Sequence, residues 1–354
     1  MSSSASGIEH VLTHLDKRRF FSLFLLSILL IFSIPIAVAF GTVYKPWDVL
    51  SYLFGNSQTG AGLVVALRFR RVIAAVIVGA LIGGGSMLAQ ASFRNPLASP
   101  FTLGISHAAA LGVAVSLLLQ VGGLGGAWII SFTRPFFVAF FAFIFAAFQV
   151  VLILLLSWWA GLDTRALVLA SIAVSFTYQA ILYFMQYLVL DEVQLATVIF
   201  WTFGDLGKVG WSELMLLLVG FPLFAAMYIA LHKDLDLIVF GDELAKASGV
   251  EPRKMRLTAV IISALGAALA TAFVGVLAFL GLLSSHVTRM IVGGRHKFQI
   301  PGAMLTGALL LTWSDLLSRT LLAPLVLPVG VLLSFIGGPL LVFLLFRVNR
   351  SGND

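Results

Sequence analysis

Few side chains in this sequence have a type and spacing that could carry out covalent chemistry. The 354 residues include no cysteine, which excludes thiol nucleophiles, disulfides and thiolate metal sites. Neither a Gly-x-x-x-x-Gly-Lys-Ser/Thr phosphate loop nor a His-Glu-x-x-His zinc motif occurs. Ser285 beside His286 is the nearest approach to a nucleophile and base, and no acid is placed to orient the histidine. We therefore expect no catalytic residue, bound cofactor or metal, and any energy-consuming chemistry must come from a separate chain.

One cluster of cations, Arg68-Phe69-Arg70-Arg71, lies at the end of a long apolar stretch. Such arginines either extend to lipid phosphates or form a cationic surface for an acidic partner. Asp315 and Arg319 lie four residues apart, acid before base, which is the spacing of an ion pair within one helix. Structural pairing is the favoured role of Asp315, whereas Arg319 lies near a helix end and could also reach outward.

Residues 234–256 form a long polar loop that mixes acidic and basic side chains. Asp242 and Glu243 begin a short helical pattern, with Lys246 three or four positions on and Gly249 placed to cap it. Pro252 suits the first turn of the following helix. The pattern predicts two short helices joined at a glycine. They form either a solvated hairpin or a knob that a cytoplasmic motor protein could grip.

Two further regions are too polar to face lipid. Residues 94–106 form a proline-containing turn, and irregular backbone at membrane depth is tolerated only inside protein or beside a cavity. Gln90 and Asn95, which lie at this turn, are either helix caps or polar residues at the opening of a pathway. Residues 166–188 carry eight hydroxyl and amide side chains and could line a water-filled route. His107 is a lone histidine in apolar surroundings, where a core position is commoner than a ligand role.

The elements that must position these residues are membrane-spanning helices. Hydrophobic residues make up 60% of the chain and charged residues 10%, with a mean hydropathy of +1.06; soluble domains carry about 25% charged residues. No stretch alternates at period two, so a helical bundle is favoured over a barrel. At about 20 apolar residues per crossing, the charge-free runs predict ten spans, at 20–43, 70–91, 102–120, 134–157, 166–188, 212–231, 256–275, 278–293, 302–321 and 329–347.

Ten crossings place both termini on one side. With the N-terminus inside, 15 of the 22 basic residues are cytoplasmic and seven are outside, as the positive-inside rule requires. The excess of basic residues in cytoplasmic loops then accounts for the net charge of +7. The charge is therefore no argument for nucleic-acid binding. The first apolar stretch is longer than the roughly 7–15 residues of a signal-peptide core, so we expect it to stay as an anchor.

Several motifs in order along the chain resemble the permease subunits of bacterial ABC importers for iron-siderophores, haem and cobalamin, the FecCD family. The resemblance extends over about residues 20–347. Its residues are Arg68 to Arg71, Gly79 to Gly85, Gln90, Arg94 to Pro100, Leu103 to Ser106, Phe200-Trp201 with Gly204, Gly241 to Val250, Phe279-x-Gly281-Leu282 with His286 and Arg289, Asp315 with Arg319, and Leu327 to Gly330 with Gly337-x-Pro339.

The resemblance implies an all-α polytopic membrane protein with about ten transmembrane helices in an ABC importer type II permease-like bundle. Residues 1–354 would form one permease domain, with a cytoplasmic segment 1–19, a bundle 20–347, a cytoplasmic coupling loop 234–256 and a tail 348–354. Implied partners are a second permease copy (homodimer, or heterodimer with a paralogue), two cytoplasmic ABC ATPase subunits that hold ATP and magnesium, a periplasmic or lipoprotein substrate-binding protein, and membrane lipid. Nucleic acid is not among them.

The resemblance also implies roles for individual residues. The translocation gate would be Asn95, Leu97, Asp163 and Thr164, and the pathway would be lined by Gln90, His107, Ser175, Gln179 and Tyr183. Arg68, Arg71 and Arg319 would dock the binding protein. ATPase coupling would fall to Gly241, Asp242, Glu243, Ala245, Lys246, Ala247, Gly249 and Val250. The chain departs from the family at Arg70 and Ser285, where proline is usual, and at His107, where a small residue is usual.

Two other functional classes remain to be weighed. An ion-coupled secondary transporter or channel predicts an ionisable residue near mid-membrane, and Asp315 is the one candidate. An intramembrane enzyme predicts a catalytic pair inside the spans, for which only Ser285 with His286 comes near. The cargo among iron-siderophore, haem and cobalamin is not encoded in these motifs.

Overall fold

The computed structural model describes residues 2–44, 46–53, 61–121, 134–161 and 164–351. Within these ranges every regular element is helical. In chain order they are α1 (Ser2–Ala39), α2 (Pro46–Leu53), α3 (Ala61–Phe93), η1 (Pro100–Leu103), α4 (Ile105–Val121), α5 (Arg134–Trp159), α6 (Thr164–Leu188), α7 (Glu192–Thr202), η2 (Leu206–Lys208), α8 (Trp211–Ala230), α9 (His232–Phe240), α10 (Asp242–Ala247), α11 (Pro252–Val274), α12 (Leu280–Val292), α13 (His296–Thr320) and α14 (Val329–Ser351).

Ten of these helices coincide with the ten predicted spans. Seven of them, α1, α3, α5, α6, α8, α11 and α13, are long and apolar enough to cross a membrane. The other three contain shorter apolar segments, Ile105–Leu119, Leu280–Val292 and Val329–Leu340. An all-helical membrane bundle is thus confirmed, whereas the count of ten crossings stays a prediction.

Helix ends differ from the predicted spans where charged residues were used as boundaries. α1 continues back to Ser2 through residues 2–19, predicted as a cytoplasmic segment outside the first span, and α3 begins at Ala61 rather than at residue 70. Lysine and arginine are good helix formers, so a helix continues through them past the end of the apolar run. As a result Arg68, Arg70 and Arg71 lie within α3, about two to three turns after its first residue.

The core is built around α3, which packs on α13, α11, α12 and α8. Gly79 and Gly83, a Gly-x-x-x-Gly pair, face the backbone of α13: a Cβ at Gly79 would lie 2.3 Å from the carbonyl oxygen of Gly307, and one at Gly83 would lie 2.1 Å from that of Ala303. Without side chains at these points the two backbones touch, as in membrane helix pairs joined by small residues. The contact fixes α3, the helix that carries the outer arginines and Gln90.

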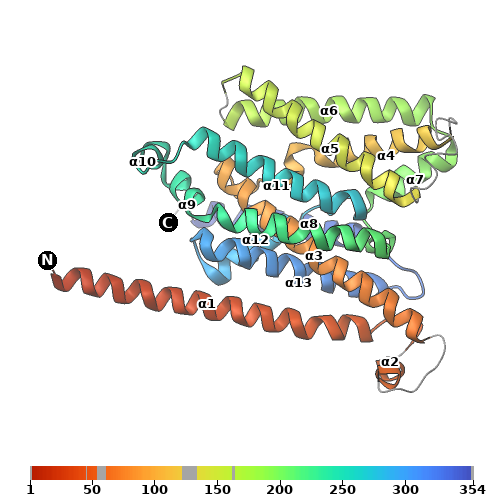
Figure 1. The fold of residues 1–354 in the computed structure, drawn as a ribbon, viewed down its shortest axis with the longest axis horizontal. Coiled ribbons are helices and arrows are strands. Elements are labelled where there is room, and N and C mark those ends of the chain that lie inside the picture. Colours follow the sequence, from red (N-terminus) through yellow and green to blue (C-terminus); the bar gives the residue numbers. More distant parts are fainter. Residues whose placement is uncertain (1, 45, 54–60, 122–133, 162–163, 352–354) are drawn as a thin grey trace.

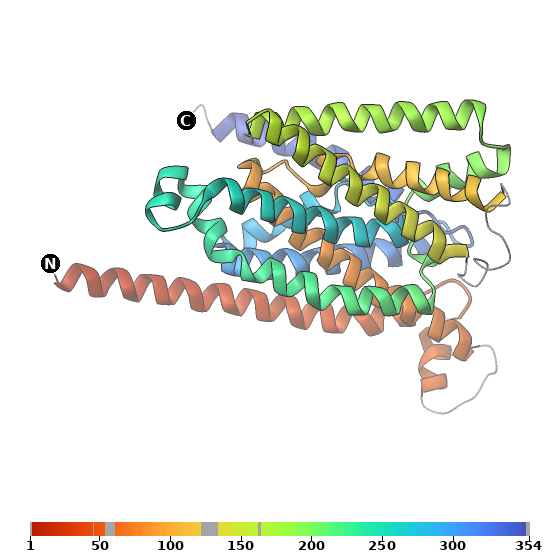
Figure 2. The same cartoon turned by 45° about the horizontal axis from the view of Figure 1, so that its top comes forward.

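The helices run side by side, and their two ends carry different features (Figures 1 and 2). Both chain termini and the α9–α10 segment lie at one end, while α2 and α7 lie at the other. Termini on a common side are what an even number of crossings requires. The end with the termini is called the coupling end below, and the opposite end the outer end.

Candidate functional site

The α9–α10 elbow protrudes at the coupling end (Figure 1). The predicted short helix is confirmed: α10 begins at Asp242, ends at Ala247 and is followed by Gly249 at φ +84°. The glycine that joins two short helices is a different one, Gly241 at φ +138°, which lies between the end of α9 at Phe240 and the start of α10. Pro252 opens α11 in its first turn, as predicted. A φ of +138° is accessible essentially to glycine alone, which explains why the elbow bends at this residue.

Asp242 is held by arginines from two other parts of the chain. Its Oδ1 accepts hydrogen bonds from Arg256 on α11, at 2.5 Å, and from Arg94 just after α3. Partial burial acts to raise the pKa of Asp242, but the charges and hydrogen bonds of Arg256 and Arg94 outweigh it and hold that pKa below its usual value. Lys246, expected opposite Asp242 on the same helix, is exposed and forms no ion pair with the described residues, because the arginines occupy the carboxylate.

The tip of the elbow is apolar and exposed. Phe240 is 78% exposed and Leu244 50% exposed, beside exposed Val239. Of the remaining predicted coupling residues, Glu243, Ala247 and Gly249 are exposed, Gly241 and Val250 are half-buried, and Ala245 is buried against the bundle. Exposed apolar side chains surrounded by polar ones mark a protein-binding surface.

Two hydrogen bonds between Asp236 and His296 anchor α9 to the start of α13. Asp236 accepts from both the backbone N–H and the imidazole Nδ1 of His296 at the start of α13, at 2.9 and 2.6 Å. Burial acts to raise the pKa of Asp236, and the hydrogen bonds from His296 prevail and lower it. The elbow is therefore fixed at its base while its tip stays free.

The predicted gate residues are only partly described. Asn95 and Leu97 lie in an exposed turn after α3, where Asn95 Oδ1 accepts from the backbone N–H of Leu97 at 2.9 Å. That hydrogen bond makes Asn95 the closing residue of its own turn. Asp163 lies outside the described residues, and Thr164 begins α6 but its side chain is not described.

The predicted pathway residues fall into two groups. Gln90 is buried and accepts a hydrogen bond from Arg289 on α12, and Ser175 donates to the carbonyl of Ser171. Gln179 Nε2 donates to the hydroxyl of Tyr183 at 2.6 Å on the exposed side of α6, where Tyr183 is 58% exposed. Ser175 and Gln179 lie one turn apart on α6, whereas Gln90 lies on α3 and forms no hydrogen bond with α6 among the described residues. A route along α6 would therefore need a second surface to close it.

His107 stands apart from both groups. It is half-buried at the start of α4, and its Nδ1 is buried with no hydrogen-bond partner among the described residues. No described group of three or more histidine or acidic residues could hold a metal ion. His107 is thus neither a satisfied core histidine nor part of a recognisable metal site.

At the outer end, four arginines surround a cavity of about 320 Å³. Arg68 is 7% exposed and donates to the carbonyls of Val38, Ala39 and Tyr44. Arg71 and Arg319 both bind the buried carboxylate of Asp315, at 2.5 and 3.0 Å, and Arg71 also pairs with Asp205 at 3.0 Å. The predicted Asp315–Arg319 pair within one helix is confirmed. The three arginines predicted to dock a partner are already engaged within the chain.

Arg70 differs from its three neighbours. It is half-buried, lines the same cavity, and forms no ion pair or hydrogen bond with the described residues. Since Asp205 and Asp315 balance Arg71 and Arg319, Arg68 and Arg70 leave the cavity positively charged.

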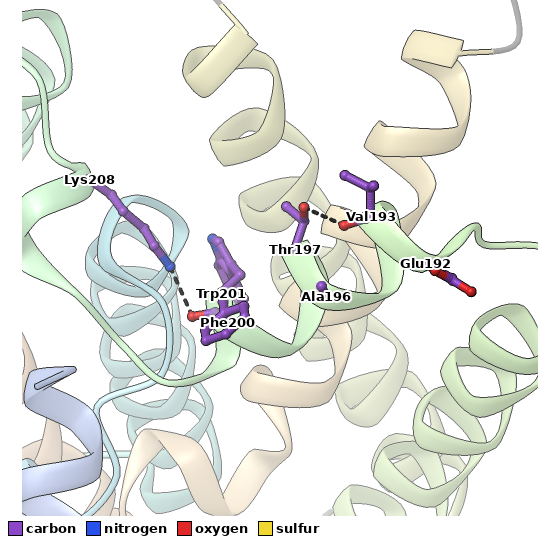
Figure 3. A pocket seen from close by; sticks show the side chains of 7 residues that line it. All are labelled: Glu192, Val193, Ala196, Thr197, Phe200, Trp201 and Lys208. Atoms are coloured by element: carbon purple, nitrogen blue, oxygen red, sulfur yellow. Dashed lines mark hydrogen bonds between the residues drawn. The ribbon is translucent and has the colours of Figure 1, made fainter.

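A larger cavity of about 550 Å³ at the outer end lies against α7 (Figure 3). It is lined by Glu192, Val193, Ala196, Thr197, Phe200, Trp201 and Lys208. Lys208 Nζ donates to the carbonyl of Phe200 at 3.1 Å. The pKa of Lys208 lies below its usual value, because burial outweighs the opposing effect of the nearby Asp205 charge. The lining is mostly apolar, and the figure shows the α7 side chains projecting from one helix rather than from facing walls.

Sequence reasoning missed three of these features. From the sequence, Arg94 is recognised only as part of a motif. Its position directly before Asn-Pro is the signal that could have indicated a role at the turn. The exposed tip had a signal too, since Leu237 to Phe240 is an apolar run inside a charged loop. Asp205 had none, because its pairing with Arg71 depends on the tertiary fold.

Comparison with known proteins adds to this geometry. The family model described as the FecCD transport family matches residues 26–347, most of the chain. The chain belongs to the FecCD transport family. FecCD members are permease subunits of transport systems, so its role is transport rather than catalysis, and it is a multi-pass protein of the inner membrane.

Individual FecCD relatives match over most of their length. A protein named as an ABC transporter permease in Methanocaldococcus jannaschii is 36% identical over 86% of this chain and 87% of its own. The hemin transport system permease HmuU of Yersinia pestis is 34% identical over 81% of this chain and 84% of its own. A solved metal-chelate type ABC transporter in an inward-facing conformation has a TM-score of 0.79, 25% identity, and covers 93% of this chain and 99% of its own.

Proposed function

We propose that this chain is the membrane-spanning permease subunit of an ATP-driven ABC importer that brings a metal chelate into the cytoplasm. The cargo class is an iron-siderophore complex or a haem- or cobalamin-like chelate. The similarity to a hemin permease and to a metal-chelate type transporter supports this choice. ATP would be hydrolysed on separate ATPase subunits.

The observation that carries the proposal is the exposed apolar tip of the α9–α10 elbow, with Phe240 78% exposed at the coupling end. A side chain of this size in water is costly, at roughly 1.5–3 kcal/mol if fully exposed rather than buried. Because the base of the elbow is fixed by Asp236 and Asp242, a protein bound at the tip pushes against the bundle itself. This suits an ATPase that drives the permease by rigid-body rocking.

The other predicted roles follow from this orientation. The coupling end would face the cytoplasm, with both termini inside. The outer end would receive the substrate-binding protein at the arginine cavity formed by Arg68, Arg70, Arg71 and Arg319. Asn95 and Leu97, with Asp163 and Thr164, would form the cytoplasmic gate. The exposed polar side of α6 would be completed as a pathway by a second permease copy, identical or paralogous.

An ion-coupled transporter is not favoured. Its candidate ion ligand, Asp315, already binds two arginines and is 1% exposed as a side chain, so it offers no free oxygen to a coupling cation.

The test is uptake by proteoliposomes that contain this chain, the ATPase and the binding protein. Haem, a ferric hydroxamate and cobalamin should be offered separately, with ATP inside. Accumulation of one of them that requires ATP and survives ionophores is expected. Uptake that proceeds without ATP and stops with an ionophore would contradict the proposal and favour ion coupling.

A further inference from the structure

Arg94 lies between the helix that forms the core and the turn predicted to form the gate. α3 ends at Phe93, and Arg94 adopts φ +45°, one of two non-glycine residues with positive φ among those described. This left-handed conformation is unfavourable for a residue with a side chain. It turns the backbone sharply into Asn95 and sends the Arg94 side chain toward the elbow.

The Arg94 guanidinium bridges both helices of the elbow. Its Nε donates to the carbonyl of Ile238 on α9 at 2.9 Å, and its Nη2 donates to the same carbonyl and to Oδ1 of Asp242 on α10. One planar group therefore grips the last turn of α9 and the first residue of α10. The flexible point between them, Gly241, is spanned by this side chain.

The turn on the other side of Arg94 is internally rigid. The backbone N–H of Asn95 donates to the carbonyl of Gln90 at 3.1 Å, and that of Ala98 donates to the carbonyl of Asn95 at 3.1 Å. Together with the Asn95–Leu97 hydrogen bond, these contacts make residues 94–98 a fixed turn continuous with α3. A displacement of α10 that drags Arg94 is therefore delivered to Asn95 and Leu97 without being absorbed in between.

Arg256 provides an internal comparison. It binds the same oxygen of Asp242 but belongs to α11 and has no described contact with the turn. Both arginines hold α10, and only one of them leads to the gate.

We infer that Arg94 is the positioning residue that transmits movement of the α9–α10 elbow to the turn that carries Asn95 and Leu97. This inference rests on the proposed function, since the movement would come from an ATPase bound at the tip. The side chain of Arg94 contacts Ile238 and Asp242 of the elbow, and Arg94 acts through the turn that follows it.

The test uses the absence of cysteine from the chain. Leu97 is 48% exposed, so Leu97→Cys supplies a single thiol in this subunit at the gate. The rate of its alkylation by a maleimide is measured in the complex with its ATPase, with and without a non-hydrolysable ATP analogue. Cargo taken up per ATP hydrolysed is measured in parallel, without the label. Both are compared among Arg94, Arg94→Ala, Arg94→Lys and, as the matched control, Arg256→Ala.

We expect the nucleotide to change the alkylation rate in the Arg94 protein and in Arg256→Ala. In Arg94→Ala that change is lost, and uptake per ATP falls roughly five-fold, as for loss of one partly exposed ion pair. Arg94→Lys keeps the charge without the planar two-site grip and restores part of both readouts. It also covers the case in which Arg94→Ala does not assemble.

Three results would overturn the inference. In the first, Arg94→Ala and Arg94→Lys keep the full nucleotide response. In the second, Arg256→Ala loses as much of the response as Arg94→Ala, which would show that the loss comes from a weaker attachment of α10 and not from the link to the gate turn. A wild-type complex that takes up cargo without ATP and shows no nucleotide response would overturn the proposed function together with the inference. In the first two cases the wild-type response is present, so the two failures are told apart.

Discussion

Replacing Asp315 by asparagine should be among the most destabilising conservative changes in this protein. The Asp315 side chain is 1% exposed and accepts from Arg71 at 2.5 Å and from Arg319 at 3.0 Å. Asparagine keeps the shape but removes the charge, which leaves two buried or nearly buried cations with one remaining acid, Asp205. Removing one partner of a buried ion pair costs about 3–5 kcal/mol.

That cost can be converted into a melting shift. An unfolding entropy of about 2.1 cal/mol/K per residue gives about 0.7 kcal/mol per kelvin for 354 residues. Asp315→Asn should therefore lower Tm by about 4–7 °C, measured by intrinsic tryptophan fluorescence in nanodiscs. Asp205→Asn is the matched control. Asp205 is 33% exposed, pairs with Arg71 and accepts a backbone hydrogen bond from Gly207 that asparagine can also accept, so the change should cost less than about 1 kcal/mol and lower Tm by about 1 °C.

A double variant sharpens the reasoning. Asp315→Asn with Arg319→Gln leaves Arg71 paired with Asp205 and restores charge balance, so it should recover part of the loss. Equal shifts for Asp315→Asn and Asp205→Asn, or no recovery in the double variant, would refute the view that uncompensated buried charge is what destabilises the outer end.

Three further outcomes are expected. The folded-state pKa of Asp242 lies below the ordinary value of 3.8. The ionised carboxylate of Asp242 therefore stabilises the fold fully above pH 3.8, and this stabilisation is lost as pH falls through the lowered pKa. The Tm difference between wild type and Asp242→Asn should be constant from about pH 8 to 5 and shrink below 3.8. A Cβ at Gly241 or Gly249 meets nothing within 4 Å, but the φ angles are +138° and +84°. Changing either glycine to alanine should therefore lower the free energy of unfolding by about 1–3 kcal/mol. Gly294 lies in open space without a positive φ, so Gly294→Ala is the control and should leave Tm unchanged. Arg70→Glu should slow association of the binding protein about ten-fold at low salt with Tm unchanged, and an equal effect at high salt would contradict a steering role.

Much of the fold was predictable because it depends on local pattern. Apolar runs located the ten helices that coincide with the predicted spans, and Asp242, Gly249 and Pro252 located α10 and the start of α11, since helix starts and stops are determined by a few neighbouring residues. The Gly-x-x-x-Gly spacing of Gly79 and Gly83 is a packing signal that is visible in the sequence, and it agrees with the backbone contact at Gly307. Helix ends were less predictable, because charge marks where the apolar run stops and not where the helix stops.

The site was less predictable because its contacts are long-range. Arg71 and Asp315 are 244 positions apart in the chain, and Arg94 and Asp242 are 148 apart. Three arginines in one short segment look alike in sequence, and only the fold distinguishes Arg68, which donates to backbone carbonyls, from Arg70, which donates to none of the described groups. The docking role predicted for Arg68, Arg71 and Arg319 stays a prediction. Their internal contacts make Arg70 the cleaner residue for testing it.

Hydrogen bonds and ion pairs link the helices to one another at both ends of the bundle, and these links limit how the protein can move. At the outer end, Arg319 donates to the carbonyls of Ala37 and Phe40 while it binds Asp315, which joins α13 to the end of α1. At the coupling end, Asp236 joins α9 to α13, and Asp242 joins α10 to α11 and to the end of α3. Because α3 and α13 are in backbone contact between these ends, little freedom remains for helices to slide within one chain. We therefore expect opening and closing to occur mainly between copies, with each chain moving as one body driven from its elbow.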